Sequence, residues 1–202
     1  MKIREMNLPN KLSLLRILMA LIIIGVLLFP FHDVGLSFPK YLLGGVYVDL
    51  KYFIAGFLFI AASATDYFDG KIARDRKIVT DFGKTVDAIA DKVLVNSVLI
   101  ILSAQGFIPP MITVIVIVRD SITNAIKMVA GNKGDVIAAS NLGKIKTACL
   151  MGGIVLTLFY NLPFEMWNLP VADFLLVFAA IMAIISGYDY YSANKKYLFP
   201  KK

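Results

Sequence analysis

Residues 66–91 read DYFDGKIARDRKIVTDFGKTVDAIAD, and this stretch decides the fold that the sequence predicts. It places four aspartates, Asp66, Asp69, Asp87 and Asp91, at the edges of long apolar runs. On a helix, the first two share one face with three further residues, which are Gly70, Ala73 and Arg74. On the following helix, the last two share a face with Gly83. A short link at residues 75–81 joins the two helices, so the sequence predicts two acidic faces that look toward each other.

Four carboxylates at a membrane boundary indicate a bound cation. An unpaired acid near hydrocarbon costs about 2–4 kcal/mol, and repulsion between the carboxylates adds to that cost. Two divalent ions would cancel the four negative charges. Because the nearby ligands are oxygens, with no histidine or cysteine, they favour Mg²⁺ or Mn²⁺ over zinc. The stretch therefore predicts a two-metal site for phosphoryl transfer.

The spacing of these residues is D-x2-D-G-x2-A-R-x8-G-x3-D-x3-D, which resembles the signature of the CDP-alcohol phosphotransferases. The resemblance implies an enzyme that joins a CDP-linked lipid to an alcohol and releases CMP. It implies that the four aspartates hold two divalent ions and that Asp91 also takes the proton of the acceptor hydroxyl. The residues that would border the CDP-lipid are Asp69, Gly70, Ala73, Arg74 and Gly83. A homodimer is also expected from the resemblance, and the pair Gly152-Gly153 would permit close helix contact.

The whole chain is too apolar for a soluble protein of 202 residues, since 58% of the residues are hydrophobic and the mean hydropathy is +0.74. We predict an all-α polytopic membrane protein with one domain at residues 12–202, a short C-terminal tail and an interfacial segment at residues 1–11. Turn residues separate six predicted transmembrane helices, near residues 12–29, 51–72, 82–104, 110–130, 145–161 and 170–193. Residues 31–50 are expected to form an external loop.

The distribution of basic residues predicts the orientation of these spans. One side collects most of the lysines and arginines, including Lys71, Arg74 and Lys144, whereas the other collects only Lys40 and Lys51. Basic loops stay in the cytoplasm, so both termini and the acidic stretch are expected there, in a multi-pass protein of the cell membrane. The net charge of +7 is then explained by this bias and by attraction to anionic lipid, and nucleic acid is not an expected partner.

Charged residues inside the predicted spans are further candidates. Arg119 holds an anionic group of the second substrate, forms a self-contained pair with Asp120, or snorkels to the interface. Lys144 and Lys146 open the fifth helix, where they either clamp the acceptor's phosphate or anchor the helix at the membrane surface. Arg16 lies about one turn inside the first helix and is expected to snorkel to the interface.

The two basic elements, Arg119 and the pair Lys144 and Lys146, favour an acceptor that is itself anionic. We therefore expect CDP-diacylglycerol and glycerol 3-phosphate as substrates, with membrane lipids as further partners. The stretches NLPNKLSLLRIL and AASNLGKIKT also resemble the bacterial branch of the family that makes phosphatidylglycerophosphate. Inositol phosphate, or phosphatidylglycerol as in cardiolipin synthesis, are alternative acceptors. Two other classes of function stay open, a cation-coupled transporter that uses the carboxylates as an ion site and a catalytically silent membrane scaffold.

Overall fold

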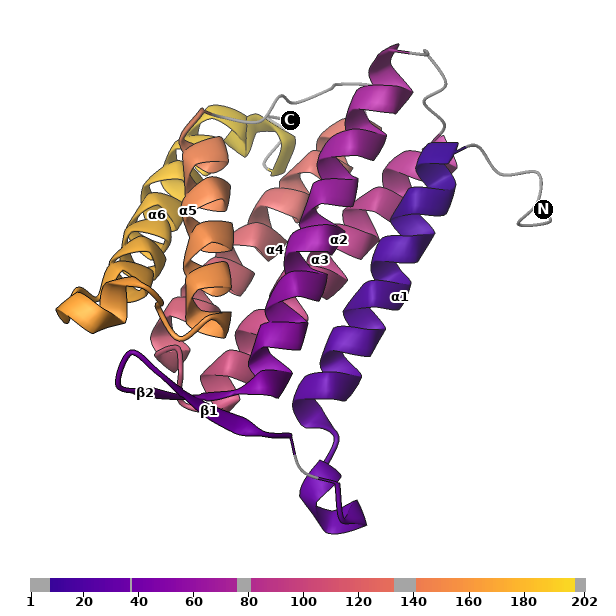
Figure 1. Ribbon diagram of the computed structural model, residues 1–202. Helices are drawn as coiled ribbons and strands as arrows, with labels where there is room; N and C mark the ends of the chain where they lie inside the picture. The colour runs from indigo at the N-terminus through magenta and orange to yellow at the C-terminus, as the bar shows by residue number, and fades with distance from the viewer. Residues whose placement is uncertain (1–7, 37, 76–80, 133–140, 199–202) are drawn as a thin grey trace. The chain divides into compact units, whose positions relative to one another are not determined.

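The computed structural model describes residues 8–36, 38–75, 81–132 and 141–198. Residues 76–80 of the predicted link, and residues 1–7 of the predicted interfacial segment, lie outside this part. The described residues form six long α-helices, as the sequence predicts (Figure 1). Their bounds are α1 Leu8–Leu28, α2 Leu50–Asp75, α3 Asp81–Ala104, α4 Pro110–Asn132, α5 Asn141–Leu158 and α6 Val171–Leu198.

The helices begin and end where the sequence breaks its apolar runs. Pro110 is the first residue of α4, a position where proline costs nothing because its missing N–H would have no helical partner. Gly106, just before it, has a φ of 81°, which favours glycine at the turn between α3 and α4. Because α2 runs to Asp75, it carries all the acidic and small residues of the first signature half on one helix.

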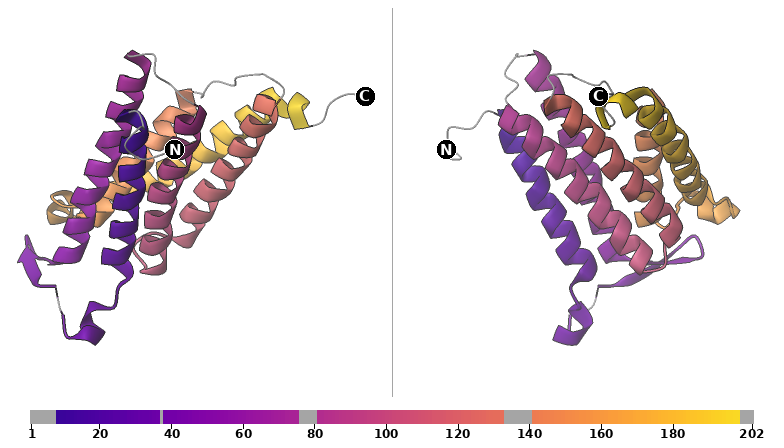
Figure 2. Two further views of the ribbon diagram at one scale, coloured as in Figure 1. Left: turned by 90° about the vertical axis from the view of Figure 1, so that its right-hand side faces the viewer. Right: turned by 180° about the vertical axis from the view of Figure 1, so that it is seen from behind.

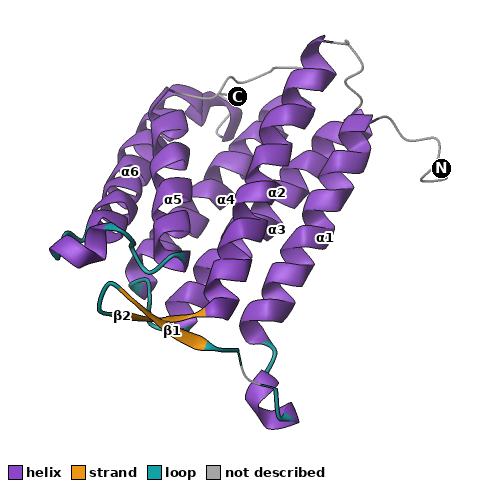
Figure 3. Ribbon diagram, viewed as in Figure 1, coloured by secondary structure: helices purple, strands orange, loops and turns teal. Residues whose placement is uncertain are grey.

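The predicted external loop contains a β-hairpin that the sequence analysis missed. Strand β1 (Lys40–Leu43) pairs antiparallel with β2 (Val46–Asp49), with Leu43 opposite Val46 (Figure 3). Gly44 and Gly45 form the turn, and both have positive φ, the conformation that two-residue hairpin turns require. A short 3₁₀ helix (Phe31–Val34) precedes the hairpin. The sequence signal was the pair of glycines between two runs of aromatic and β-branched residues.

The described residues fall into two compact units, and the single-domain interpretation stays a prediction. The first unit is Met1–Leu102 with Leu158–Leu169. In it α1 packs against α2, and α3 lies alongside α1 (Figure 2). Small residues of α1 and α2 are among those that are almost fully buried, including Ala20, Ala55 and Ala62.

In this unit, residues 158–169 pack against α2 near its N-terminal end. The ring of Phe159 packs edge-on against Phe53 and closely against the backbone at Gly56. The backbone N–H of Asp49 donates a 3.1 Å hydrogen bond to the hydroxyl oxygen of Tyr160.

The second unit is Ser103–Thr157 with Pro170–Lys202. Here α4 packs against α6, and α5 approaches α6 where Gly153 faces Leu176. A Cβ at position 153 would lie 2.8 Å from the Leu176 side chain, so the glycine allows this close approach. Gly153, one of the two glycines expected to permit close helix contact in a homodimer, thus has a packing role within the chain, and the homodimer stays a prediction.

Large apolar side chains cover the outer faces of the helices in both units. Leu18, Leu21 and Phe57 of the first unit are each more than half exposed, as are Met111 and Phe174 of the second. Within the described part of the chain, two helical stretches are long and apolar enough to cross a membrane, Asn10–Leu28 and Val171–Lys195. Exposed apolar faces of this kind fit lipid as the surrounding solvent.

Candidate active site

Three helices of the first unit bring charged side chains to one point. The Nη1 nitrogen of Arg16, on α1, lies 2.7 Å from Oδ1 of Asp66, on α2. The same nitrogen lies 2.8 Å from Oδ1 of Asp87, on α3. We call these three residues the acidic cluster, because two carboxylates meet one guanidinium. Both carboxylates are partly exposed, whereas the arginine side chain is almost completely buried.

The expectation that Arg16 snorkels to the membrane surface is wrong. Its exposed fraction is 0%, and its guanidinium donates a 2.8 Å hydrogen bond to Asp87. Asn10 and Ser13 are also buried, so α1 presents polar residues at a spacing of three along one face. That spacing, N-x2-S-x2-R at the start of an apolar helix, was the signal that the sequence analysis did not use.

The remaining signature residues also lie on α2 and α3. Asp91 and Gly83 lie four residues on either side of Asp87 along α3, and therefore on its face of the helix. Gly70 stands four residues after Asp66 on α2. The side chains of Asp69, Ala73 and Arg74 lie outside the described part, so their predicted roles stay predictions. Among the described side chains, no three aspartates, glutamates, histidines or cysteines form a group that would hold a metal.

The donor set that is described fits a hard cation. Two carboxylate oxygens from different helices touch one positively charged nitrogen, so they converge closely enough for a single cation to contact both. Carboxylate oxygens are the ligands that Mg²⁺ and Mn²⁺ prefer. In the acidic cluster the positive group is an arginine, and the metal-binding role of the aspartates stays a prediction.

A second charged group lies in the second unit, and we call Arg119, Asp120 and Lys146 the basic cluster. Nη1 of Arg119 lies 2.9 Å from Oδ1 of Asp120. The ammonium group of Lys146, on α5, donates hydrogen bonds of 3.0 and 3.1 Å to the two oxygens of Asp120. Nη2 of Arg119 also donates to Ser186 on α6. Asp120 and Lys146 are both buried, so this carboxylate organises two cations inside the unit.

These contacts bring together residues that the sequence analysis considered separately. The pairing of Arg119 with Asp120 is one of the interpretations that the sequence leaves open, and Lys146 joins that pair. Lys144, two residues earlier on α5, is exposed. The phosphate-binding roles predicted for Arg119, Lys144 and Lys146 stay predictions.

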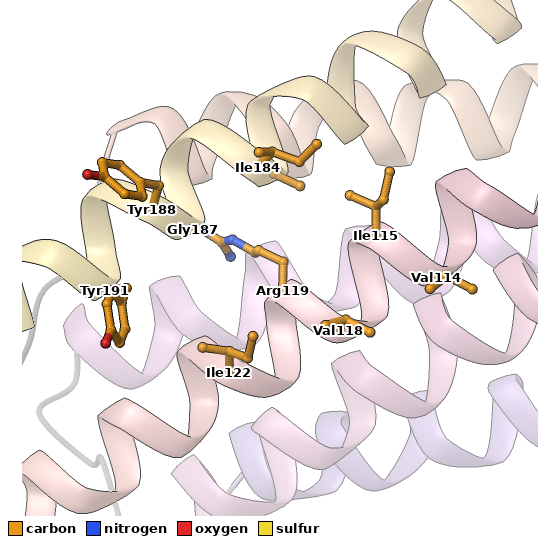
Figure 4. Close-up of a pocket in the computed structure, with 10 residues that line it drawn as sticks. Val114, Ile115, Val118, Arg119, Ile122, Ile184, Gly187, Tyr188 and Tyr191 are labelled. Atoms are coloured by element: carbon orange, nitrogen blue, oxygen red, sulfur yellow. The ribbon is translucent and has the colours of Figure 1, made fainter. Parts of the chain in front are cut away.

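An apolar groove of about 560 Å³ runs along Arg119, between α4 and α6. Apolar side chains of both helices line it, including Val118 and Ile184, with Tyr188 at its edge (Figure 4). A Cβ at position 187 would lie 3.0 Å from Cγ of Arg119, so a larger residue there would require the Arg119 side chain to shift. The groove thus places one guanidinium beside a surface suited to hydrocarbon.

The fold and site define a helical protein with apolar outer faces and a carboxylate centre suited to a cation. Residues 6–186 match the model of the CDP-alcohol phosphatidyltransferase family, and the chain belongs to that family. It is therefore a CDP-alcohol phosphatidyltransferase, and its two apolar helices together with the family indicate a membrane protein.

Several curated relatives are similar to this chain over most of their length. A CDP-diacylglycerol–glycerol-3-phosphate 3-phosphatidyltransferase of Bacillus subtilis is 37% identical over 93% of this chain and 95% of its own length. An enzyme of the same name from Rickettsia bellii is 32% identical over 98% of this chain and 99% of its own. A probable phosphatidylglycerophosphate synthase of Mycobacterium tuberculosis is 35% identical over 93% of this chain and 81% of its own.

Proposed function

We propose that this enzyme transfers the phosphatidyl group of CDP-diacylglycerol to glycerol 3-phosphate, giving phosphatidylglycerophosphate and CMP, at the cytoplasmic surface of the cell membrane. The convergence of Asp66 and Asp87 on one cationic nitrogen is the observation that carries the proposal. The complete aspartate signature and the names of the similar enzymes support the substrates.

Two divalent ions, Mg²⁺ or Mn²⁺, would be held by four aspartates, which are Asp66, Asp69, Asp87 and Asp91. When bound, such ions supply positive charge to the pyrophosphate and to the leaving CMP. Gly70, Ala73 and Gly83 would leave room for the nucleotide, and Arg74 would donate hydrogen bonds to its phosphate.

Asp91 is the proposed general base. It takes the proton of the acceptor hydroxyl, and the hydroxyl oxygen attacks the lipid-side phosphorus. The phosphorus–oxygen bond to CMP then breaks, and CMP leaves with the electron pair. Because the carboxylate acts in the reacting complex, replacing Asp91 with asparagine should lower kcat by about 10²-fold or more and change KM less.

The acceptor's phosphate would bind Arg119, Lys144 and Lys146. Arg119, Asp120 and Lys146 together carry one positive charge in excess, which favours an anionic ligand. A guanidinium also matches phosphate oxygens in geometry. An acceptor with no net negative charge, such as the zwitterion serine, would gain little from these groups.

The test offers CDP-diacylglycerol and Mg²⁺ to the purified full chain with one of four acceptors, and measures CMP. Glycerol 3-phosphate is expected to drive release, whereas inositol phosphate, serine and phosphatidylglycerol should leave it near background. Release driven by phosphatidylglycerol or inositol phosphate would reassign the acceptor within the family. Ion or solute flux across vesicles without CMP would overturn the proposal in favour of a transporter.

A further inference from the structure

Arg16 belongs to the acidic cluster, but the proposed reaction gives it no role. Its guanidinium is fully buried, yet it is held by two carboxylates that are both close to half exposed. A buried arginine needs partners because burying an unpaired charge is costly. Asp66 and Asp87 are those partners, and they are also proposed metal ligands.

Asp66 and Asp87 also need a positive group between them. Asp66 and Asp87 come from different helices, and their negative charges at this separation repel each other. Arg16 removes that repulsion by placing one nitrogen against an oxygen of each. The guanidinium thereby joins α1 to α2 and to α3.

A divalent ion on the same two carboxylates changes this balance. A doubly charged ion and a guanidinium that share two carboxylates repel each other, and the repulsion is twice that between two single charges at equal distance. The ion therefore competes with Arg16 for these oxygens.

We infer that Arg16 is a resident cation of the active site: it holds Asp66 and Asp87 together when no divalent ion is bound and gives way when the ion enters. Arg16 is a positioning residue in this scheme, since it acts through the two aspartates. The inference rests on the proposed metal-binding role of those aspartates.

The experiment compares the wild-type chain with Arg16→Met, which keeps the apolar stem and removes the charge. Mn²⁺ affinity is measured on the purified full chain in detergent by electron paramagnetic resonance, because bound Mn²⁺ loses the signal of the free ion. Loss of the competing charge should make Arg16→Met bind Mn²⁺ about 10-fold more tightly. Arg16→Lys, which keeps one positive charge, should lie closer to the wild type.

Thermal unfolding supplies a second readout. In EDTA, Arg16→Met should unfold several degrees below the wild type, because the carboxylates then repel each other. Mn²⁺ should raise its midpoint by more than it raises that of the wild type. Arg119→Met is the matched control: it removes an arginine whose described partners are Asp120 and Ser186, so its loss of stability should be equal in EDTA and in Mn²⁺.

Unchanged or weaker Mn²⁺ binding by Arg16→Met would overturn the inference, and so would an equal loss of stability with and without the ion. If Arg16→Met does not fold even with Mn²⁺, weaker binding by Arg16→Lys than by the wild type would overturn it. Failure of the proposed metal site would look different. In that case the wild type itself would not bind Mn²⁺, or Asp87→Asn would bind it equally well.

Discussion

The acidic cluster and the basic cluster are built from similar parts with opposite charge. In the first unit, one guanidinium lies between two carboxylates, whereas in the second unit one carboxylate lies between a guanidinium and an ammonium group. The first set of three side chains has one negative charge in excess, and the second has one positive charge in excess. The sign of the excess indicates which ligand completes each cluster, a cation in the first and an anion in the second.

Their burial also differs. The side chains of Asp66 and Asp87 are 46% and 44% exposed, but that of Asp120 is 11% exposed. The aspartates of the acidic cluster can therefore be reached by a ligand, whereas Asp120 serves mainly to hold its two cations. Substitution of an aspartate should accordingly change mainly activity in the first cluster and mainly stability in the second.

Asp87→Asn should give the largest effect. It removes a proposed metal ligand, so CMP release should fall by about 10³-fold while the helices stay folded. Activity and circular dichroism, measured on the same preparation, check both parts. Asp33→Asn, which changes an exposed aspartate in the 3₁₀ helix, should keep the wild-type activity. Equal activity of the two variants would contradict the comparison.

Asp120→Asn should destabilise the protein by about 3 kcal/mol, because it leaves the buried Lys146 and the largely buried Arg119 beside a neutral amide. Denaturant unfolding in detergent measures this change. Asp173→Asn, at an exposed position in the first turn of α6, is the control and should change stability by less than about 1 kcal/mol. A stable Asp120→Asn variant would show that this carboxylate does not organise the basic cluster.

Arg119→Met should raise the KM for glycerol 3-phosphate about 10- to 100-fold and change kcat less, since a charged hydrogen bond to the phosphate is lost. Steady-state kinetics with saturating CDP-diacylglycerol separate the two constants. The exposed Lys40 in β1 offers a control, and Lys40→Met should leave both constants unchanged. A fall in kcat at constant KM would instead favour the purely structural pairing with Asp120.

The smallest expected effects come from replacing glycines at close contacts within each unit, and the loss of stability should be similar in the two units. A Cβ at Gly56 would lie 2.7 Å from the Phe159 ring, and one at Gly153 would lie 2.8 Å from Leu176. Each alanine substitution should cost about 1–2 kcal/mol, because a neighbouring side chain must shift. Gly25→Ala in α1 meets no atom within 4 Å and should not destabilise the helix. Unfolding curves of the three variants test this, and an equal cost at position 25 would show that helix packing is not the cause.

Much of the fold could be predicted because long apolar runs and their breaks depend on local sequence. All six helices occur where the sequence predicts them, with ends that differ by a few residues. The hairpin was missed because its strands are only four residues long and lie in an aromatic, glycine-rich loop. Six spans and cytoplasmic termini stay predictions, since only two helical stretches of the described part meet the test of length and composition.

The candidate site was predicted in part. Asp66 and Asp87 could be placed on facing helices from their spacing alone, and their shared contact with Arg16 fits that prediction. Arg16 itself could not be placed, because an arginine one turn inside an apolar helix can turn either to the surface or to a partner. The partner is distant in sequence, and only helix packing decides between the two.

The sequence by itself determined the aspartate signature, the apolar helices and the family, because these depend on residue type and on spacing along one chain. The tertiary structure decided which charged side chains meet. Arg16 meets Asp66 and Asp87, and Lys146 meets Asp120. The physical reason is that an ion pair inside a protein depends on the distance between side chains from different helices. Helix packing sets that distance, and the spacing within a single helix does not.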